Sequence, residues 1–251
     1  MILGNNEKFK GIGYVCYIDV LGFSDNILKN WNSQTSNPLE KILSIKREMP
    51  IFTEIEDDGQ ENSRKYVCRV NTVSDSVTIC FGFNDEIIVG DLVLGLEAVL
   101  GNISYIWSMF IMNGYTIRGA IEFGDVYWDE SDLIGPAFIN AYRLESEVAK
   151  NSRILVSSNL NRVFSNLVKH YDSSLTAHVF KYFRKDVDGY IIVDPNILYK
   201  SDSERSDRIE ELKKSRDAVS SGIVREKYNP LISMLSEGTS TGLKYSDIGS
   251  Y

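Results

Sequence analysis

Residues 14–26, YVCYIDVLGFSDN, place one carboxylate, Asp19, inside a segment that is otherwise suited to a buried strand. The residues before Asp19 are mostly apolar and alternate poorly with polar ones, which is typical of a central strand covered on both faces. An unpaired buried carboxylate is costly or changes its protonation. The chain must therefore supply a positive partner for Asp19 or bind a cation there.

The composition indicates an ordinary globular protein. The chain has 251 residues, of which 43% are hydrophobic and 25% are charged, enough for one large domain or one domain with an appendage. Its net charge of −8 disfavours a surface that follows the phosphates of DNA or RNA. We therefore expect no nucleic-acid partner, although a small anionic ligand can still bind through metal ions.

The cysteines and the N-terminus predict a cytoplasmic protein. The three cysteines are odd in number, lie in apolar runs and show no C-x-x-C spacing, as expected for buried thiols in a reducing compartment: Cys16, Cys68 and Cys80. Residues 1–11 lack the pattern of a secretory signal. Residues 98–117 carry no charge, but Asn102 and Asn113 interrupt their apolarity, so we expect a core helix, with a membrane span as the alternative.

The order of elements indicates an α+β protein. Hydrophobic spacing predicts helices at about 25–31 and 39–52, a β-hairpin over 65–83 that turns at 74–76, and a helix from 89 to about 112. Further on it predicts a half-covered strand at 115–123, a helix at 135–150, a strand at 153–158 and a hairpin around Asp188 and Gly189. The sheet should be rich in antiparallel pairs and ferredoxin-like.

A composition change near residue 200 divides the chain. Residues 1–200 are expected to form the main domain, and residues 201–251 a C-terminal helical extension with a tail. In the extension an apolar stripe at helical spacing should pack on the domain or on a second subunit: Ile209, Leu212, Val219 and Ile223. Pro230 should begin a short final helix.

Two aspartates are candidate metal ligands. Asp19 ends the first strand, and Asp75 lies in the turn of the hairpin. If these strands are neighbours, the carboxylates meet and repel unless a cation lies between them, and oxygen ligands favour Mg²⁺ or Mn²⁺. A turn role for Asp75, or a cap or salt bridge for Asp19, is the structural alternative.

Four segments together resemble the class III nucleotidyl cyclases. YIDVLGFS resembles the first-strand motif of that family, VNTVSDSVTICF its metal-binding hairpin, and TIRGAIEFGDV its next core strand. DLIGPAFINAYRLES followed by ILVSSNL resembles the family's DIWGNTVNVASRMES followed by ILVSEET. The four motifs occur in the family's order over about residues 13–195, which makes the set more specific than any one of them.

The resemblance implies a catalytic domain that uses two divalent ions, Mn²⁺ or Mg²⁺. Asp19, Asp75 and the carbonyl of Val20 would hold the ions on a nucleoside triphosphate. The backbone amides of residues 22–24 would bind the triphosphate at a helix N-terminus, namely Gly22, Phe23 and Ser24, although Ser24 is alternatively only a cap.

The resemblance also implies residues for the transition state. Arg143 aligns with the family's transition-state arginine, and its structural alternative is a salt bridge with Glu147. The family's asparagine four residues before that arginine is replaced by Ile139, and Asn140 is one position late. Arg184 or Lys185 is nearest to the family's late phosphate-binding lysine, with a solvated hairpin charge as the alternative.

The base-binding positions depart from the purine cyclases. The family uses Lys for adenine or Glu for guanine at the position that Asn71 holds here, while Asp132 occupies the second specificity position. The forms DVLGFS and GPAFINAYRLE are similar to bacterial pyrimidine cyclases of Pycsar anti-phage systems, which make cyclic UMP or cyclic CMP for a separate effector.

The resemblance therefore predicts a uridylate or cytidylate cyclase that acts as a homodimer with shared active sites, with uracil the preferred base. Two alternatives stay open. One is an adenylate or guanylate cyclase with another base pocket, and the other is a degenerate cyclase domain that binds nucleotide without catalysis.

Overall fold

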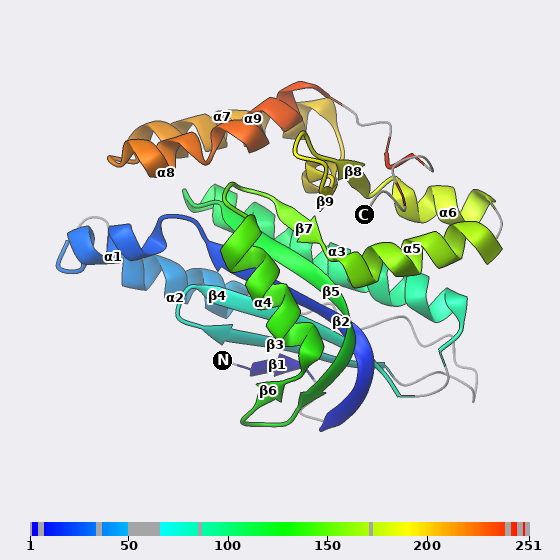
Figure 1. Ribbon diagram of the computed structural model, residues 1–251. Helices are drawn as coiled ribbons and strands as arrows, with labels where there is room; N and C mark the ends of the chain where they lie inside the picture. Colours follow the sequence, from blue (N-terminus) through cyan, green and yellow to red (C-terminus); the bar gives the residue numbers. More distant parts are fainter. Residues whose placement is uncertain are drawn as a thin grey trace.

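The protein has an α+β fold, seen in a computed structural model that describes residues 2–4, 8–33, 37–49, 66–84, 87–170, 173–238, 242–244 and 248 (Figure 1). Its strands are β1 (Ile2–Gly4), β2 (Phe9–Val20), β3 (Tyr66–Val73), β4 (Ser76–Phe83), β5 (Ile117–Trp128), β6 (Leu133–Ile134), β7 (Ile154–Val156), β8 (Phe183–Lys185) and β9 (Ile191–Val193). They form one sheet in the order β1-β3-β4-β2-β5-β7-β9-β8, with β6 paired to β5. Of the described pairings, β5 with β7 is parallel and the others are antiparallel, so the expected antiparallel-rich sheet is confirmed.

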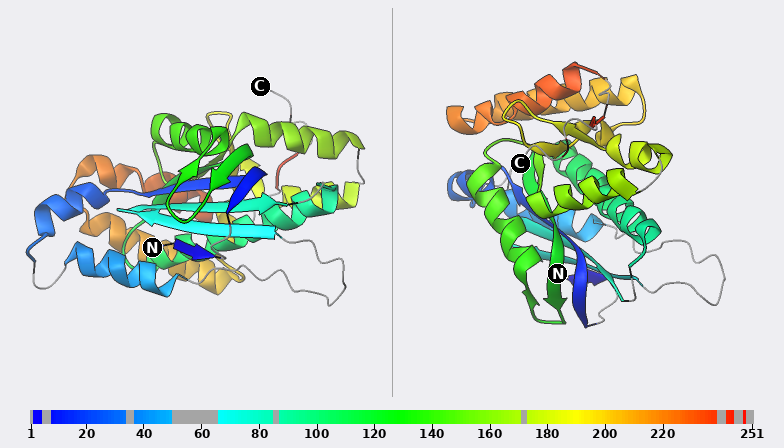
Figure 2. Two further views of the ribbon diagram at one scale, coloured as in Figure 1. Left: turned by 90° about the horizontal axis from the view of Figure 1, so that it is seen from below. Right: turned by 45° about the vertical axis from the view of Figure 1, so that its right-hand side comes forward.

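The described helices cover both faces of this sheet and extend past its edges. They are α1 (Phe23–Asn30), α2 (Pro38–Glu48), α3 (Val89–Met112), α4 (Pro136–Val148), α5 (Ser158–His170), α6 (Ser173–Phe180), the short 3₁₀ helix η1 (Pro195–Leu198), α7 (Asp202–Ala218), α8 (Gly222–Glu226) and α9 (Asn229–Ser236). Helix α4 lies on one face of the sheet, and α2 and α3 lie on the other (Figure 2).

Strand β2 is a central strand covered on both faces, as its sequence predicts. Cys16 and Ile18 belong to the larger core, which also includes residues of α3 such as Leu96. The alternate residues Val15 and Tyr17 face the smaller cluster under α4. Asp19 follows in this alternation and therefore lies on the α4 face of the sheet.

Helix α3 is the core helix expected from the uncharged segment. It is long and apolar enough to span a membrane, and half of its most apolar window is buried inside the protein. Leu96, Ile103 and Trp107 are at most 2% exposed in the main core. Asp91 Oδ2 accepts a hydrogen bond from the Ile88 N–H at 2.9 Å, which fixes the first turn.

Strand β5 differs from the half-covered strand predicted for residues 115–123. It runs to Trp128, and both of its faces are covered because α4 packs across it. Ala120 and Glu122 lie on one face and Ile121 on the other, and these residues are 0%, 2% and 0% exposed. Alternation alone does not reveal a covering helix that follows later in the chain.

The N-terminal elements agree with the predictions, apart from their boundaries. The hairpin turns at Ser74 and Asp75, with Ser74 at φ 52°. Helix α1 begins at Phe23, two residues earlier than predicted, because Gly22 adopts a left-handed conformation at the N-cap. Helix α2 ends at Glu48, and the last predicted helical residues, 50–52, lie outside the described residues.

The C-terminal extension packs back on the domain (Figure 1). Leu212, Leu231 and Leu235 are fully buried in the main core. Ile209, Leu212 and Val219 of the predicted stripe pack on the main core, although helix α7 ends at Ala218 and Val219 is extended. The prediction is wrong at Ile223, which is 74% exposed. The three cysteines are buried thiols, and the second hairpin forms as β8 and β9 around the predicted turn.

Candidate functional site

The carboxylate of Asp19 has a cationic partner in the chain. In the pairing of β2 with β5, Asp19 lies opposite Arg118. Arg118 donates to Asp19 Oδ2 from Nη2 at 2.9 Å and from Nε at 3.2 Å. The two side chains are 21% and 23% exposed, so the ion pair is largely buried. Of the two solutions that the sequence left open, the positive partner is present.

Arg118 also contacts a second carboxylate. Its Nε lies 2.7 Å from Glu145 Oε1, which comes from α4 and is 2% exposed. The contact lacks the geometry of a hydrogen bond, since that oxygen has no hydrogen-bond partner. Burial raises the pKa of Glu145 to about 7, with Arg118 acting against this effect and Asp19 adding to it. One guanidinium thus faces two carboxylates that are unequally stabilised.

Asp75 approaches the same cluster from the β3–β4 turn. Strands β2 and β4 are neighbours, and Ile18 pairs with Val77, one residue from Asp19 and two from Asp75. The pKa of Asp19 is raised mainly by burial; the Arg118 hydrogen bond opposes this rise, and the negative charge of Asp75 adds to it. The pairing of β2 with β4 thus places the Asp75 turn beside the end of β2 that carries Asp19.

A lysine lies beside the Asp75 turn. Lys46 of α2 donates from Nζ to the Ser74 carbonyl. Burial lowers the pKa of Lys46, and the charge of Asp75 opposes this effect. The Asp75 carboxylate accepts from Ser74 Oγ at 3.0 Å. These contacts hold the turn against α2, and sequence reasoning missed Lys46 because it lies in an ordinary amphipathic helix.

Few side chains near Asp19 and Asp75 could act as metal ligands. Among the described residues there is no group of three or more His, Cys, Asp or Glu side chains placed to hold a metal ion. Asp19 and Asp75 supply two carboxylates, and Val20 follows Asp19 at the end of β2. Mg²⁺ is commonly bound by one or two carboxylates together with substrate phosphates, so two aspartates suffice only if a phosphate ligand completes the shell.

Helix α1 begins directly after this cluster. Gly22 at its N-cap has φ 76°, and a Cβ there would lie 2.6 Å from Cγ1 of Val224. Phe23 is buried, whereas Ser24 is exposed within the first turn, so Ser24 is not the N-cap. No side chain caps the helix. The N–H groups of the first turn are therefore available to an anion.

The two candidate base-binding residues lie on neighbouring segments. Asn71 is half-buried on β3, and Asp132 is exposed in the turn after β5. Arg69 shares the face of β3 with Asn71, and its Nη2 lies 3.4 Å from the carbonyl of Glu130. This contact places the Asp132 turn beside β3, while the Asp132 N–H itself donates to Asp129 Oδ1 at 2.9 Å.

Arg143 and Asn140 lie elsewhere on the surface of the same chain. Both are exposed on α4 and line a pocket of about 340 Å³, together with Glu122 and Ser157. Glu145 is two residues after Arg143, which places it on roughly the opposite side of the helix. Because Glu145 faces Arg118, Arg143 points away from the Asp19 cluster. Within the described part of the chain, no ion pair joins Arg143 to Glu147.

Arg184 and Lys185 are also distant from Asp19 in one chain. They lie on β8, four strand positions from β2 and hence about 19 Å across the sheet. Arg184 pairs with Glu237 of the extension at 3.0 Å, and Lys185 is exposed. The structure thus brings together Asp19, Asp75 and the start of α1. The predicted cationic residues, Arg143, Arg184 and Lys185, lie away from this cluster.

Known families offer no further guide to this site. No protein-family model matches the chain, and no curated protein sequence matches it.

Proposed function

We propose that this chain is a nucleotide cyclase of the class III type that converts UTP or CTP into the 3′,5′-cyclic nucleotide and pyrophosphate. The observation that carries the proposal is the convergence of Asp19 and Asp75 beside the uncapped N-terminus of α1, where Gly22 turns the chain. An acidic pair next to unpaired N–H groups suits a metal-bound triphosphate better than either ligand alone.

The sheet supports the same proposal. Strands β3, β4, β2 and β5 are neighbours in this order, and they are connected along the chain as β2, helices, β3, β4, helix and β5. This order supports the proposal of a ferredoxin-like core, whose split β-α-β units would place the strands in this way. A cyclase core with added strands β7–β9 and a C-terminal extension would have this order.

Two divalent ions would bind here if a substrate phosphate completes the set of ligands. Burial raises the pKa of Asp19 and the negative charge of Asp75 adds to this rise, and a cation between the two carboxylates would remove the repulsive part. When bound, Mg²⁺ or Mn²⁺ would supply activation of the ribose 3′-hydroxyl and charge neutralisation on the departing pyrophosphate. The protein would contribute Asp19, Asp75 and the Val20 carbonyl as ligands, with Arg118 giving up part of its contact to Asp19.

Further residues have proposed roles in substrate binding. The N–H groups of Gly22, Phe23 and Ser24 would bind the triphosphate. Asn71 and Asp132 would contact the base: the amide of Asn71 offers both a donor and an acceptor, as a pyrimidine edge does.

A shared site in a homodimer accounts for the position of Arg143. Because Arg143 and Asn140 face away from Asp19 in their own chain, they would serve the Asp19 cluster of a second copy. Arg143 would then neutralise charge that develops on the α-phosphate. Arg184 or Lys185 would likewise bind phosphate only across this interface.

A non-catalytic domain is the second candidate, and one observation favours it. The ion pair of Asp19 with Arg118 satisfies the strand carboxylate without any metal ion. A chain that binds nucleotide but does not cyclise it would keep this pair intact. A purine cyclase is the third candidate and differs only in the base contacts of Asn71.

The biological role that follows is production of a cyclic pyrimidine nucleotide in the cytoplasm as a second messenger of anti-phage defence. The product would activate a separate effector, so the chain itself would need neither nucleic acid nor a membrane.

The test is incubation of the purified chain with Mn²⁺ and each of ATP, GTP, CTP and UTP separately, with detection of cyclic products by mass spectrometry. We expect cyclic UMP or cyclic CMP from the wild type and none from Asp19→Asn or Asp75→Asn. Asp207→Asn, an exposed change on α7 with the same charge difference, is the matched control and should retain activity.

The other outcomes separate the candidates. A cyclic purine as the main product would assign the chain to the purine cyclases. Nucleotide binding by calorimetry, without any cyclic product or pyrophosphate release, would favour the non-catalytic domain.

A further inference from the structure

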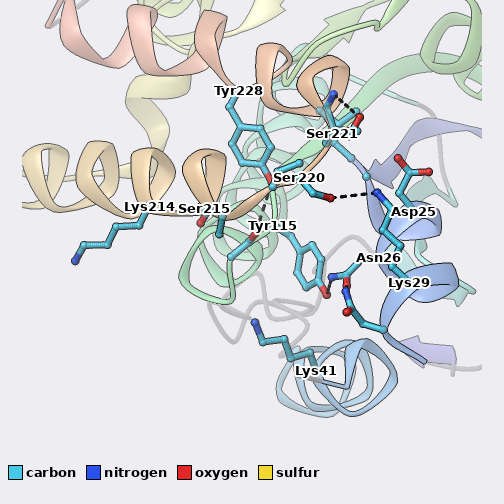
Figure 3. Close-up of a pocket in the computed structure, with 17 residues that line it drawn as sticks. Asp25, Asn26, Lys29, Lys41, Tyr115, Lys214, Ser215, Ser220, Ser221 and Tyr228 are labelled. Atoms are coloured by element: carbon cyan, nitrogen blue, oxygen red, sulfur yellow. Dashed lines mark hydrogen bonds between the residues drawn. The ribbon is translucent and has the colours of Figure 1, made fainter. Parts of the chain in front are cut away.

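A second cavity lies between the domain and its C-terminal extension. Its volume is about 460 Å³, within the range of small-molecule sites. Helices α1 and α2, the segment after α3, and the segment from α7 to α8 all contribute residues to its wall (Figure 3). Neither Asp19 nor Asp75 lines it, and Gly22 is the residue that it shares with the proposed cyclase site.

The cavity is positively charged in a chain of net charge −8. Its lining includes Lys29, Lys41 and Lys214 and one carboxylate, Asp25. Lys29 Nζ donates to Ser220 Oγ at 3.1 Å, and Lys41 Nζ donates to the Asn113 carbonyl at 3.2 Å. Both acceptors are neutral oxygens, so these contacts do not neutralise the ammonium charges.

The lysines reach the cavity from two different helices, Lys29 from α1 and Lys41 from α2. In Figure 3 the side chain of Lys29 reaches toward Ser220 on the extension, while Lys41 reaches up from α2 toward the ring of Tyr115. Lys41 Nζ lies 5.7 Å from the centre of that ring. Lys214 points away from the group, which leaves Lys29 and Lys41 as the cations that face a ligand.

A polar and an apolar wall complete the cavity. The hydroxyl of Tyr115 accepts from Asn26 Nδ2 at 2.9 Å, so its own hydrogen is not used in that hydrogen bond. Apolar side chains also line the cavity, among them Leu21, Val219 and Val224. Two ammonium groups and a phenol suit a phosphate, and the apolar wall suits the organic part of the same molecule.

We propose that this cavity binds a small organic phosphate, with the phosphate held by Lys29 and Lys41 and the organic part against Val219 and Val224. Because the walls belong to both the domain and the extension, the bound ligand would contact both and stabilise the packing of the extension on α1 and α2. This site shares Gly22 with the proposed cyclase site, but it uses neither metal ions nor Asp19 and Asp75, so binding here can be tested separately.

The test is isothermal titration calorimetry of the full chain with adenosine 5′-monophosphate and with inorganic pyrophosphate, in EDTA so that metal-dependent binding at Asp19 and Asp75 is suppressed. Adenosine is the uncharged control ligand. We expect one saturable site for a phosphate compound and no binding of adenosine. In the double variant K29Q/K41Q the dissociation constant should be about tenfold larger or more.

Two further variants sharpen the result. The double variant K169Q/K200Q changes two exposed lysines elsewhere and gives the same net charge, so it should bind like the wild type. Asp25→Asn removes the carboxylate from the lining and should tighten binding. Circular dichroism checks that each variant is folded.

The proposal is overturned if neither phosphate compound binds the folded wild type at millimolar concentration. It is also overturned if K29Q/K41Q binds as tightly as the wild type, or if the control pair weakens binding to the same extent. Because EDTA removes the metals, each of these results is separate from success or failure of the cyclase assay.

Discussion

Arg118 on β5 holds Asp19 on β2 through two hydrogen bonds to one carboxylate oxygen, across the central pair of strands. The same guanidinium touches Glu145. A single cation therefore compensates two carboxylates at the point where the proposed metal site begins. Any cation that binds Asp19 must compete with Arg118, so this pair connects the stability of the fold to the proposed function.

Replacement of Arg118 should destabilise the protein. Arg118→Met would leave Asp19 and Glu145 largely buried without their guanidinium partner, and loss of one member of a buried pair costs about 3–5 kcal/mol. Since the pair is partly exposed, we expect about 2–4 kcal/mol at pH 8, measured by urea denaturation. Arg118→Lys keeps the charge and should lose less.

The same variant reports on metal binding. If Asp19 and Asp75 are metal ligands, Mn²⁺ should raise the melting temperature of Arg118→Met more than that of the wild type, because the competing guanidinium is gone. Adding Asp75→Asn should abolish this gain. An equal effect of Mn²⁺ on all three proteins would contradict a metal site at this pair.

Glu145 should make stability depend on pH. Its pKa is raised to about 7 in the folded protein from an ordinary 4.5, so the folded state binds the proton more tightly than the unfolded state. The contribution of protonated Glu145 to the free energy of unfolding is complete below about pH 4.5. It falls by up to about 3 kcal/mol as the pH rises to about 7.

The matched variant is Glu145→Gln, which stays neutral. The variant should lack this fall between pH 5 and pH 8 and should be more stable than the wild type at the higher pH, as followed by urea denaturation at both values. If the two proteins lose stability in parallel over this range, Glu145 is not the titrating group.

Local patterns predicted much of the fold. The hairpin that carries Asp75, the long core helix α3 and the burial of the strand before Asp19 each follow from residues close in sequence. The prediction that Asp19 and Asp75 converge rests on one assumption, that their strands are neighbours, and β2 and β4 are neighbours.

The partner of Asp19 could not be predicted in the same way. Arg118 is 99 residues away, and its contact depends on the register between β2 and β5, which a one-residue slip would remove. The helical pattern of α4 did not indicate that Glu145 is buried, because its burial depends on how α4 crosses the sheet. Such non-local packing is absent from the spacing of residues.

Gly22 should not tolerate a side chain. Its φ of 76° disfavours other residues, and an added Cβ would lie 2.6 Å from Val224. We expect Gly22→Ala to cost about 1–3 kcal/mol in unfolding free energy. Gly101→Ala is the control, because Gly101 lies within α3 with open space around it and should gain up to about 1 kcal/mol. Equal stability of both variants would contradict the strained turn.

The C-terminal extension should be required for a stable domain. Leu212, Leu231 and Leu235 are 0% exposed in the main core, so removal of residues 201–251 would expose apolar surface of the domain. We expect the fragment 1–200 to lack a cooperative unfolding transition, and Leu235→Ala in the full chain to cost about 2–5 kcal/mol. A cooperative melt of the fragment close to that of the full chain would show that the extension is dispensable.

Mixing of two inactive variants should restore activity if the active site is shared between two copies. Arg143 faces away from Asp19 in its own chain, so each site would take its aspartates from one copy and its arginine from the other. Asp19→Asn and Arg143→Ala should each be inactive alone. A mixture should regain about a quarter of wild-type activity, because half of the random dimers are mixed and each has one intact site of two.

Tyr190→Phe, a change in the lining of the Arg143 pocket that leaves the arginine in place, should remain active. A mixture as inactive as its components, with both variants folded and dimeric by gel filtration, would place Arg143 outside the site and leave the Asp19 cluster to act without it.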